Sequence, residues 1–103
     1  MSKKQSFSEK CYSLLRKVPH GRVTTYKAIA EALGTKAYRV VGNAMHKNPY
    51  SPRVPCHRVV CSDSKVGGFA LGKRRKIEML KKEGLQIEKG KVKSFEKRLF
   101  EFN

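Results

Sequence analysis

Acidic residues are scarce in this sequence. Only 8 Asp and Glu stand against 24 Lys and Arg, which gives a formal net charge of +16. The excess is evenly spread, because residues 1–52 and residues 53–103 each carry a net charge of +8. A field of this sign and extent excludes an ordinary neutral enzyme and favours a polyanionic partner, either nucleic acid or an anionic membrane surface.

Long apolar runs are also missing. No stretch approaches the length needed to span a bilayer, and the Met-Ser-Lys-Lys start lacks the apolar segment of a secretory signal. We therefore expect no membrane association and a cytoplasmic location with access to nucleoid or nuclear DNA. The hydrophobic fraction of 39% excludes a disordered tail, and 103 residues predict one domain over 1–103, acting as a monomer.

Cysteines are few and are not paired in the sequence. Cys11, Cys56 and Cys61 make an odd count without a CxxC motif, so a disulfide framework is excluded and reduced thiols are expected. Cys11 belongs to the apolar stripe of a helix expected over residues 7–17, which begins after Ser6 and has Glu9 at the capping-box position. This pattern predicts that Cys11 is a small core residue.

Two further helices are expected in the first half. Thr24 or Thr25 would cap the first of them, which ends at Gly34, and Thr35 would cap the second, which runs to about Lys47. Two short helices joined by a tight turn, the second of them basic, have the outline of a helix-turn-helix. The inward face of the second helix would comprise Val40, Val41, Ala44 and Met45.

The polar side of this last helix indicates a binding surface. Lys36, Arg39, Asn43 and His46 follow one another at helical spacing and would share a face. Such a face is either a solvated helix surface or a contact surface for phosphates and bases. The net charge of +16 favours nucleic acid.

The second half combines a stiff loop with short strands. Pro49, Pro52 and Pro55 disfavour helix, residues 58–61 predict a strand, residues 62–64 a turn and residues 73–83 a helix. Lys89-Gly90 predicts a hairpin turn, and Ser94 a final helical turn. The expected fold is therefore mainly α: a small winged helix-turn-helix-like domain with a short β-hairpin.

The Pro55-Cys56-His57-Arg58 segment has residues suited to nucleophilic chemistry. Neighbouring positive charge or a basic imidazole favours the reactive thiolate of a cysteine, and His57 could take the proton of Cys56 directly or through a water. Glu83 is the candidate that would orient the imidazole. Other interpretations remain: a buried strand cysteine beside a surface histidine, or a zinc site with Cys61, although the usual paired ligand spacings are absent.

These residues carry a resemblance to a known family. Pro55-Cys56-His57-Arg58-Val59-Val60, preceded by Arg39-Val40-Val41-Gly42-Asn43-Ala44-Met45 and Lys47-Asn48-Pro49, resembles the 6-O-alkylguanine-DNA alkyltransferases, the methylated-DNA–protein-cysteine methyltransferases. The similarity extends from about Cys11 to Gly84, nearly the whole of that family's catalytic C-terminal domain.

The resemblance implies roles for individual residues. Cys56 would accept the alkyl group in a single irreversible turnover, with His57 as base through a water and Glu83 orienting it. Tyr26 would donate a hydrogen bond to the flipped guanine, and Arg39 would fill the space that the guanine leaves. Lys36, Asn43 and His46 on the polar face described above would also contact DNA, and the small residues Gly42 and Ala44 would let the helix backbone approach it closely. The remaining pocket residues would be Asn48, Arg58, Phe69, Ala70 and Lys76.

The sequence departs from the family in three respects. Residues 1–103 do not include the family's usual N-terminal domain, which carries zinc ligands in some members, so we expect no metal and no cofactor. Gly68-Phe69-Ala70-Leu71-Gly72 replaces a common Gly-Tyr-Ser-Gly-Gly pocket motif. The short chain also resembles the alkyltransferase-like proteins, which mark lesions for excision repair but have another residue in place of the cysteine. The expected function is alkyl transfer from double-stranded DNA containing alkylated guanine; the alternatives are a non-catalytic damage sensor and a winged-helix regulator.

Overall fold

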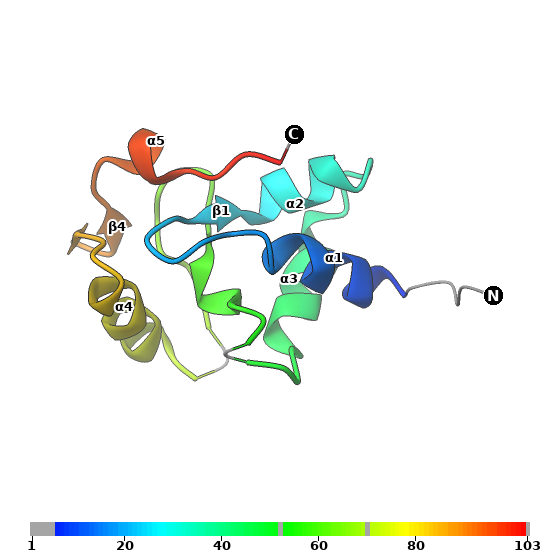
Figure 1. The fold of residues 1–103 in the computed structure, drawn as a ribbon, viewed down its shortest axis with the longest axis horizontal. Coiled ribbons are helices and arrows are strands. Elements are labelled where there is room, and N and C mark those ends of the chain that lie inside the picture. Colours follow the sequence, from blue (N-terminus) through cyan, green and yellow to red (C-terminus); the bar gives the residue numbers. More distant parts are fainter. Residues whose placement is uncertain (1–5, 52, 70, 103) are drawn as a thin grey trace.

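The helix-turn-helix unit forms one end of the protein. The computed structural model describes residues 6–51, 53–69 and 71–102, and there α1 (Phe7–Leu15), α2 (Tyr26–Ala32) and α3 (Tyr38–His46) pack on one another (Figure 1). Helix α1 begins where Ser6 Oγ accepts a hydrogen bond from Glu9 N at 3.1 Å. The buried Tyr12 hydroxyl donates to Ala44 O at 2.7 Å and so joins α1 to α3.

A small parallel sheet lies between the two ends of the molecule. Strand β1 (Thr24–Thr25) pairs in parallel with β2 (Val59–Val60), which follows a 3₁₀ turn, η1 (Cys56–Arg58). The C-terminal segment extends the sheet on the other side of β1, because Phe100 N donates to Val23 O at 2.7 Å. Three segments that are far apart in the sequence therefore meet behind η1 (Figure 1).

Helix α4 and the hairpin form the opposite end. Helix α4 (Lys73–Lys82) packs beside β3 (Ile87–Glu88) and β4 (Lys91–Val92), and α5 (Phe95–Arg98) leads to the C-terminal segment (Figure 1). Positive φ angles at Lys89 (50°) and Gly90 (76°) form the tight turn between these antiparallel strands.

The buried apolar residues form two clusters. One joins the helix-turn-helix unit to η1 and contains Cys11, Tyr12, Leu15, Val18, Ile29, Ala30, Val41, Ala44, Met45, Val54, Cys56 and Val59. The other joins the sheet to α4 and the hairpin and contains Val23, Val60, Val66, Leu80, Leu85 and Val92. The segment from Val54 to Val60 contributes residues to both clusters, so both clusters pack against the region around Cys56.

The mainly α fold with a short hairpin is confirmed, and so is the burial of Cys11. Two expectations about α3 were wrong. Thr35 does not cap it, because its Oγ1 accepts from Ala37 N in a turn and the helix begins later, at Tyr38. Val40 is 48% exposed instead of facing inward, since Val41, Ala44 and Met45 form the core side of α3 and Val40 lies outside this face.

Other boundaries differ by a few residues. Helix α1 ends at Leu15, two residues before Lys17, and the strand expected over residues 58–61 is confined to Val59–Val60 because Arg58 belongs to η1. Within the described part of the chain, no helix combines the length and apolar character needed to cross a membrane.

Candidate functional site

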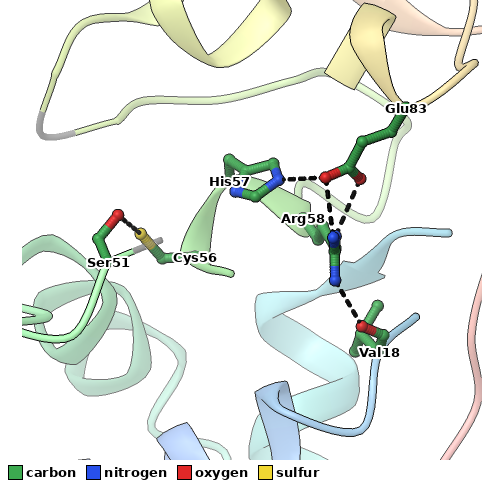
Figure 2. Close-up of polar contacts among 6 residues, drawn as sticks. All are labelled: Val18, Ser51, Cys56, His57, Arg58 and Glu83. Carbon is green, nitrogen blue, oxygen red and sulfur yellow. Dashed lines mark hydrogen bonds and ion pairs between the residues drawn. The ribbon is translucent and has the colours of Figure 1, made fainter. Parts of the chain in front are cut away.

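Cys56 lies at the start of η1, directly after the proline-containing loop. Its side chain is nearly buried, with 5% of the residue exposed. The thiol points toward Ser51, and its sulfur lies 3.9 Å from Ser51 Oγ (Figure 2). Because η1 turns sharply before β2, the adjacent Cys56 and His57 side chains diverge, one toward the loop and one toward α4.

His57 is held by Glu83, the residue that ends α4. Its Nε2 lies 2.7 Å from Glu83 Oε2, and Arg58 donates to both oxygens of the same carboxylate at 2.8 and 2.9 Å. Arg58 also donates to Val18 O at 2.9 Å. Burial alone would raise the pKa of Glu83, but hydrogen bonds from Arg58 and His57 outweigh it and lower this pKa to about 2, so the carboxylate is charged at neutral pH.

The environment of His57 defines its protonation state. Burial lowers the pKa of His57 below its ordinary value, against the opposing effect of Glu83, so the ring is neutral near pH 7. The nitrogen facing the carboxylate, Nε2, then carries the hydrogen, which leaves a lone pair on Nδ1. Nδ1 is buried and has no hydrogen-bond partner among the described residues. Glu83 lies on one side of the ring and Cys56 on the other (Figure 2).

A cavity of about 310 Å³ opens beside Cys56. Its walls come from α3, the loop after α3, the loop before α4, and α4 itself. The lining residues are Met45, His46, Asn48, Ser51, Cys56, Phe69, Leu71, Arg75 and Met79. The volume and the largely apolar walls suit a planar ring system of the size of a nucleobase.

Asn48 fixes the loop that forms one wall. Its Nδ2 donates to Val54 O at 2.8 Å, and its Oδ1 accepts from Tyr50 N at 2.9 Å. The two hydrogen bonds of the Asn48 amide thus hold the turn of this loop, and both Ser51 and Cys56 line the same cavity.

Tyr26 lies on the other side of Cys56, at the start of α2. It lines a smaller cavity together with Gly42, Cys56 and Phe69. Burial raises the pKa of Tyr26 to about 12, so its hydroxyl keeps its hydrogen and remains a donor near neutral pH. Thr25 Oγ1 accepts from Ala28 N at 2.9 Å and caps α2, which sets the position of Tyr26.

Lys76 is fully buried behind this region. Its Nζ donates to Gly68 O at 3.1 Å and lies 5.8 Å from the centre of the Tyr26 ring. Burial lowers the pKa of Lys76 to about 8. Gly67 has a φ of +78°, and a Cβ there would lie 3.1 Å from Cys61 Sγ, so this position requires glycine. Cys61 therefore packs against the loop that borders the cavity.

The other residues expected to contact DNA are distributed differently from the prediction. Arg39, Asn43 and His46 are exposed on α3, but Lys36 lies before the helix and does not share its regular face. Ala44 was expected both on the inward face and among the DNA contacts; it is buried with Val41 and Met45 on the core side of α3, as the apolar pattern predicted. Gly42 is half-buried beside the smaller cavity.

The expected pocket set is likewise only partly brought together. Asn48 and Phe69 line the larger cavity; Lys76 lies behind its loop, and Arg58 turns away to Glu83. Ala70 lies outside the described residues. Within the described residues, Cys56, His57 and Cys61 do not belong to any cluster of three or more His, Cys, Asp or Glu suited to hold a metal ion.

Leu71, part of the segment that replaces the family's pocket motif, lines the larger cavity, whereas sequence reasoning missed three other lining residues: Ser51, Arg75 and Met79. Only the fold brings these residues of the proline loop and of the α4 region beside α3. The single signal in the sequence was the helical spacing of Arg75 and Met79, four residues apart on one face of α4.

Comparisons with known proteins agree with this geometry. The family model described as "6-O-methylguanine DNA methyltransferase, DNA binding domain" matches residues 6–85 of this chain. A methylated-DNA–protein-cysteine methyltransferase of Metallosphaera sedula is 44% identical over 88 residues, which cover 85% of this chain and 55% of the relative. The chain thus spans about half the length of such curated relatives.

Two solved structures are similar over most of the chain. S. pombe Atl1 in complex with damaged DNA containing O6-carboxymethylguanine has a TM-score of 0.81 and 29% identity, and the match covers 93% of this chain and 95% of that one. Mycobacterium tuberculosis OGT in complex with DNA has a TM-score of 0.74 and 34% identity, with 79% of this chain and 51% of that one covered. The family match over residues 6–85 includes the helix-turn-helix unit and Cys56.

Proposed function

This chain belongs to the 6-O-methylguanine DNA methyltransferase family, and from that premise we propose that it repairs DNA by moving an alkyl group from O6 of guanine to Cys56. The observation that supports the proposal is the pair of His57 and the charged Glu83 directly after Cys56, which lines an open cavity. Residues 1–103 act as one domain in this proposal, and the family's catalytic part lies within it.

DNA is the proposed partner because of charge and helix geometry. The net charge of +16 favours the phosphate backbone, and Arg39, Asn43 and His46 are exposed on α3, where His46 also lines the cavity. A guanine inside the stack cannot reach a buried thiol, so the lesion must rotate out of the duplex into the cavity. Arg39, on the exposed side of α3, would occupy the space left in the stack.

The proposed reaction is a displacement at the alkyl carbon. His57 Nδ1 takes the thiol proton, directly or through a water, and the charged Glu83 stabilises the imidazolium that results. The Cys56 thiolate attacks the alkyl carbon, so a C–S bond forms as the bond between carbon and O6 breaks. The electron pair of that bond passes to the guanine, which takes up one proton and leaves as ordinary guanine.

Tyr26 supports the departure of the guanine. Its hydroxyl remains protonated, and Tyr26 lines the smaller cavity, which also contains Cys56, so it can donate to a base held at Cys56 as negative charge develops there. The thiol has lost a proton and the guanine has gained one, so the reaction needs no cofactor to balance. The thioether on Cys56 is not readily hydrolysed, and each protein molecule acts once.

A damage sensor is the second candidate, and one observation favours it. The match to S. pombe Atl1 covers nearly the full length of both chains, whereas the match to the M. tuberculosis structure covers half of that protein. A sensor would bind and flip the alkylated guanine without forming the C–S bond. The presence of Cys56 beside His57 favours transfer.

Mass spectrometry separates the two functions. After incubation with a duplex containing 6-O-methylguanine, the protein should gain one methyl group that maps to Cys56. The gain should be lost in Cys56→Ala and retained in Cys61→Ala, a matched control for a second thiol of the same region. Specific binding of the lesion duplex with an unchanged protein mass would overturn transfer and support the sensor.

A further inference from the structure

Three lysines gather at the tip of the β3–β4 hairpin. Lys89 and Lys91 flank Gly90 in its turn, and Lys73 at the start of α4 reaches the same point. The Lys73 Nζ lies 3.3 Å from where a Cβ on Gly90 would be, so its ammonium covers the turn. All three side chains are exposed, and we refer to Lys73, Lys89 and Lys91 as the hairpin cluster.

The charge of the hairpin cluster is not neutralised locally. The nearest acidic residues in the sequence already have other partners: Glu88 contacts Lys93 at 2.7 Å and Glu78 contacts Arg74 at 3.7 Å. Among the described residues, no ion pair involves a member of the hairpin cluster. Three like charges held close together repel one another, and an external anion would relieve this repulsion.

The hairpin cluster is structurally continuous with the proposed reaction site. Arg75, two residues after Lys73 on α4, lines the cavity that contains Cys56. Val66 N donates to Gly90 O at 2.8 Å and ties the hairpin tip to the segment that runs to Phe69 on the cavity wall. The first turns of α4 therefore carry one basic side chain at the cavity, Arg75, and another at the hairpin tip, Lys73.

We propose that the hairpin cluster is a second contact surface for DNA, which binds backbone phosphates of the duplex on the far side of the cavity from α3. The proposal rests on the DNA binding of the proposed function, but it does not require alkyl transfer. With α3 on one side and the hairpin cluster on the other, the duplex would be held on both sides of the flipped nucleotide. Phosphate contacts of this kind position the duplex and carry no sequence preference.

A membrane surface fits the hairpin tip less well. Val92 is buried and Ile87 is half-buried, so the tip presents lysines and glycine without the exposed apolar side chains that insert into a bilayer interface.

The test compares two variants with the same change in charge. The hairpin variant removes the three charges of the hairpin cluster by the substitutions Lys73→Gln/Lys89→Gln/Lys91→Gln. The control variant removes three exposed lysine charges of the α1 and α2 region by the substitutions Lys10→Gln/Lys17→Gln/Lys27→Gln. Binding to a duplex that extends beyond both α3 and the hairpin is measured over a series of salt concentrations. Each lost phosphate contact lowers the slope of log K against log salt by about 0.9, so the first variant should lose up to about 2.7 from its slope.

The outcomes are distinct. The hairpin variant should bind the long duplex more weakly than the control, and the two should bind equally to a short duplex that covers only the α3 side. Equal slopes for the two variants on the long duplex, with tight wild-type binding, overturn this inference alone. Wild-type protein that binds no DNA overturns the proposed function as well. Selective loss of binding to phosphatidylserine vesicles, with DNA binding unchanged, would assign the cluster to membranes instead.

Discussion

At the scale of single residues, Glu83 determines the chemistry of its neighbours. The Glu83 carboxylate accepts hydrogen bonds from His57 and from two nitrogen atoms of Arg58, and the Glu83 side chain is only 9% exposed. These contacts give the histidine a fixed tautomer and leave its Nδ1 free to act as a base. Arg58 serves as the counter-charge that keeps this carboxylate ionised, which is a different role from the pocket contact expected from the sequence.

Glu83→Gln tests this arrangement. The neutral amide cannot stabilise an imidazolium, so we expect the rate of alkyl transfer to fall about 10²- to 10⁴-fold, the usual contribution of a general base. The matched control is Glu78→Gln on the exposed side of α4, which should react at the wild-type rate. Single-turnover kinetics with a 6-O-methylguanine duplex measure both. Equal rates in the two variants would show that Glu83 has a structural role only.

At the scale of secondary-structure elements, Thr25 joins strand to helix. It is the last residue of β1, opposite Val60 in the parallel pair, and its Oγ1 caps α2 through Ala28 N. One side chain thus fixes where the sheet ends and where Tyr26 begins the helix. The same junction connects the region of Cys56 with the helix-turn-helix unit.

Thr25→Ala should destabilise the fold by about 1 kcal/mol, the usual cost of losing an N-cap. Thr25→Ser keeps the capping oxygen and should restore most of that stability, whereas a pure packing role for the threonine methyl would leave Ser no better than Ala. Urea unfolding followed by circular dichroism gives the free energies. Identical stabilities of the Ala and Ser variants would contradict the capping role.

Local patterns in the sequence predicted the helices well and the contacts between distant segments less well. Ser6, Thr25 and Lys89-Gly90 act through hydrogen bonds and dihedral angles within a few residues, so their roles could be predicted. The pairing of β1 with β2, and of Val23 with the C-terminal segment, depends on residues far apart in the sequence. No periodic pattern of residues within one segment predicts such contacts.

The same distinction holds for the candidate site. The contact between His57 and Glu83 agrees with the expectation from the sequence, where Glu83 was the candidate to orient the imidazole and the family resemblance implied the same role. The burial of Lys76 could not be predicted from its position in a run of four basic residues, of which the other three remain exposed. Its orientation follows from the tertiary packing of α4 against the loop at Gly68.

At the scale of the whole molecule, the excess of positive charge makes acidic pH the condition that destabilises the fold most. The chain carries +16 near neutral pH and has 8 acidic residues that lose their negative charge on protonation. Repulsion among the cations then increases, and the internal ion pair at Glu83 is lost at the same time.

The pH dependence of stability should therefore report on Glu83. Its pKa is lowered to about 2 from an ordinary value of 4.5, so its contribution is present above pH 4.5 and is lost as the pH falls toward 2. We expect a loss on the order of 2 kcal/mol across this window, and a flatter profile for Glu83→Gln than for Glu78→Gln. Thermal unfolding at a series of pH values measures it. Parallel profiles for the two variants would contradict the assignment.

The parallel sheet also has a consequence for how the chain folds. Its pairs join Thr24 to Val59 and Val23 to Leu99, so large loops must close before any of these contacts stabilise the chain. The backbone hydrogen bonds within helices α1 to α4, by contrast, join residues that are close in the sequence. We therefore expect the pairing of the sheet, and not the closing of a helical turn, to limit the refolding rate of this mainly helical protein.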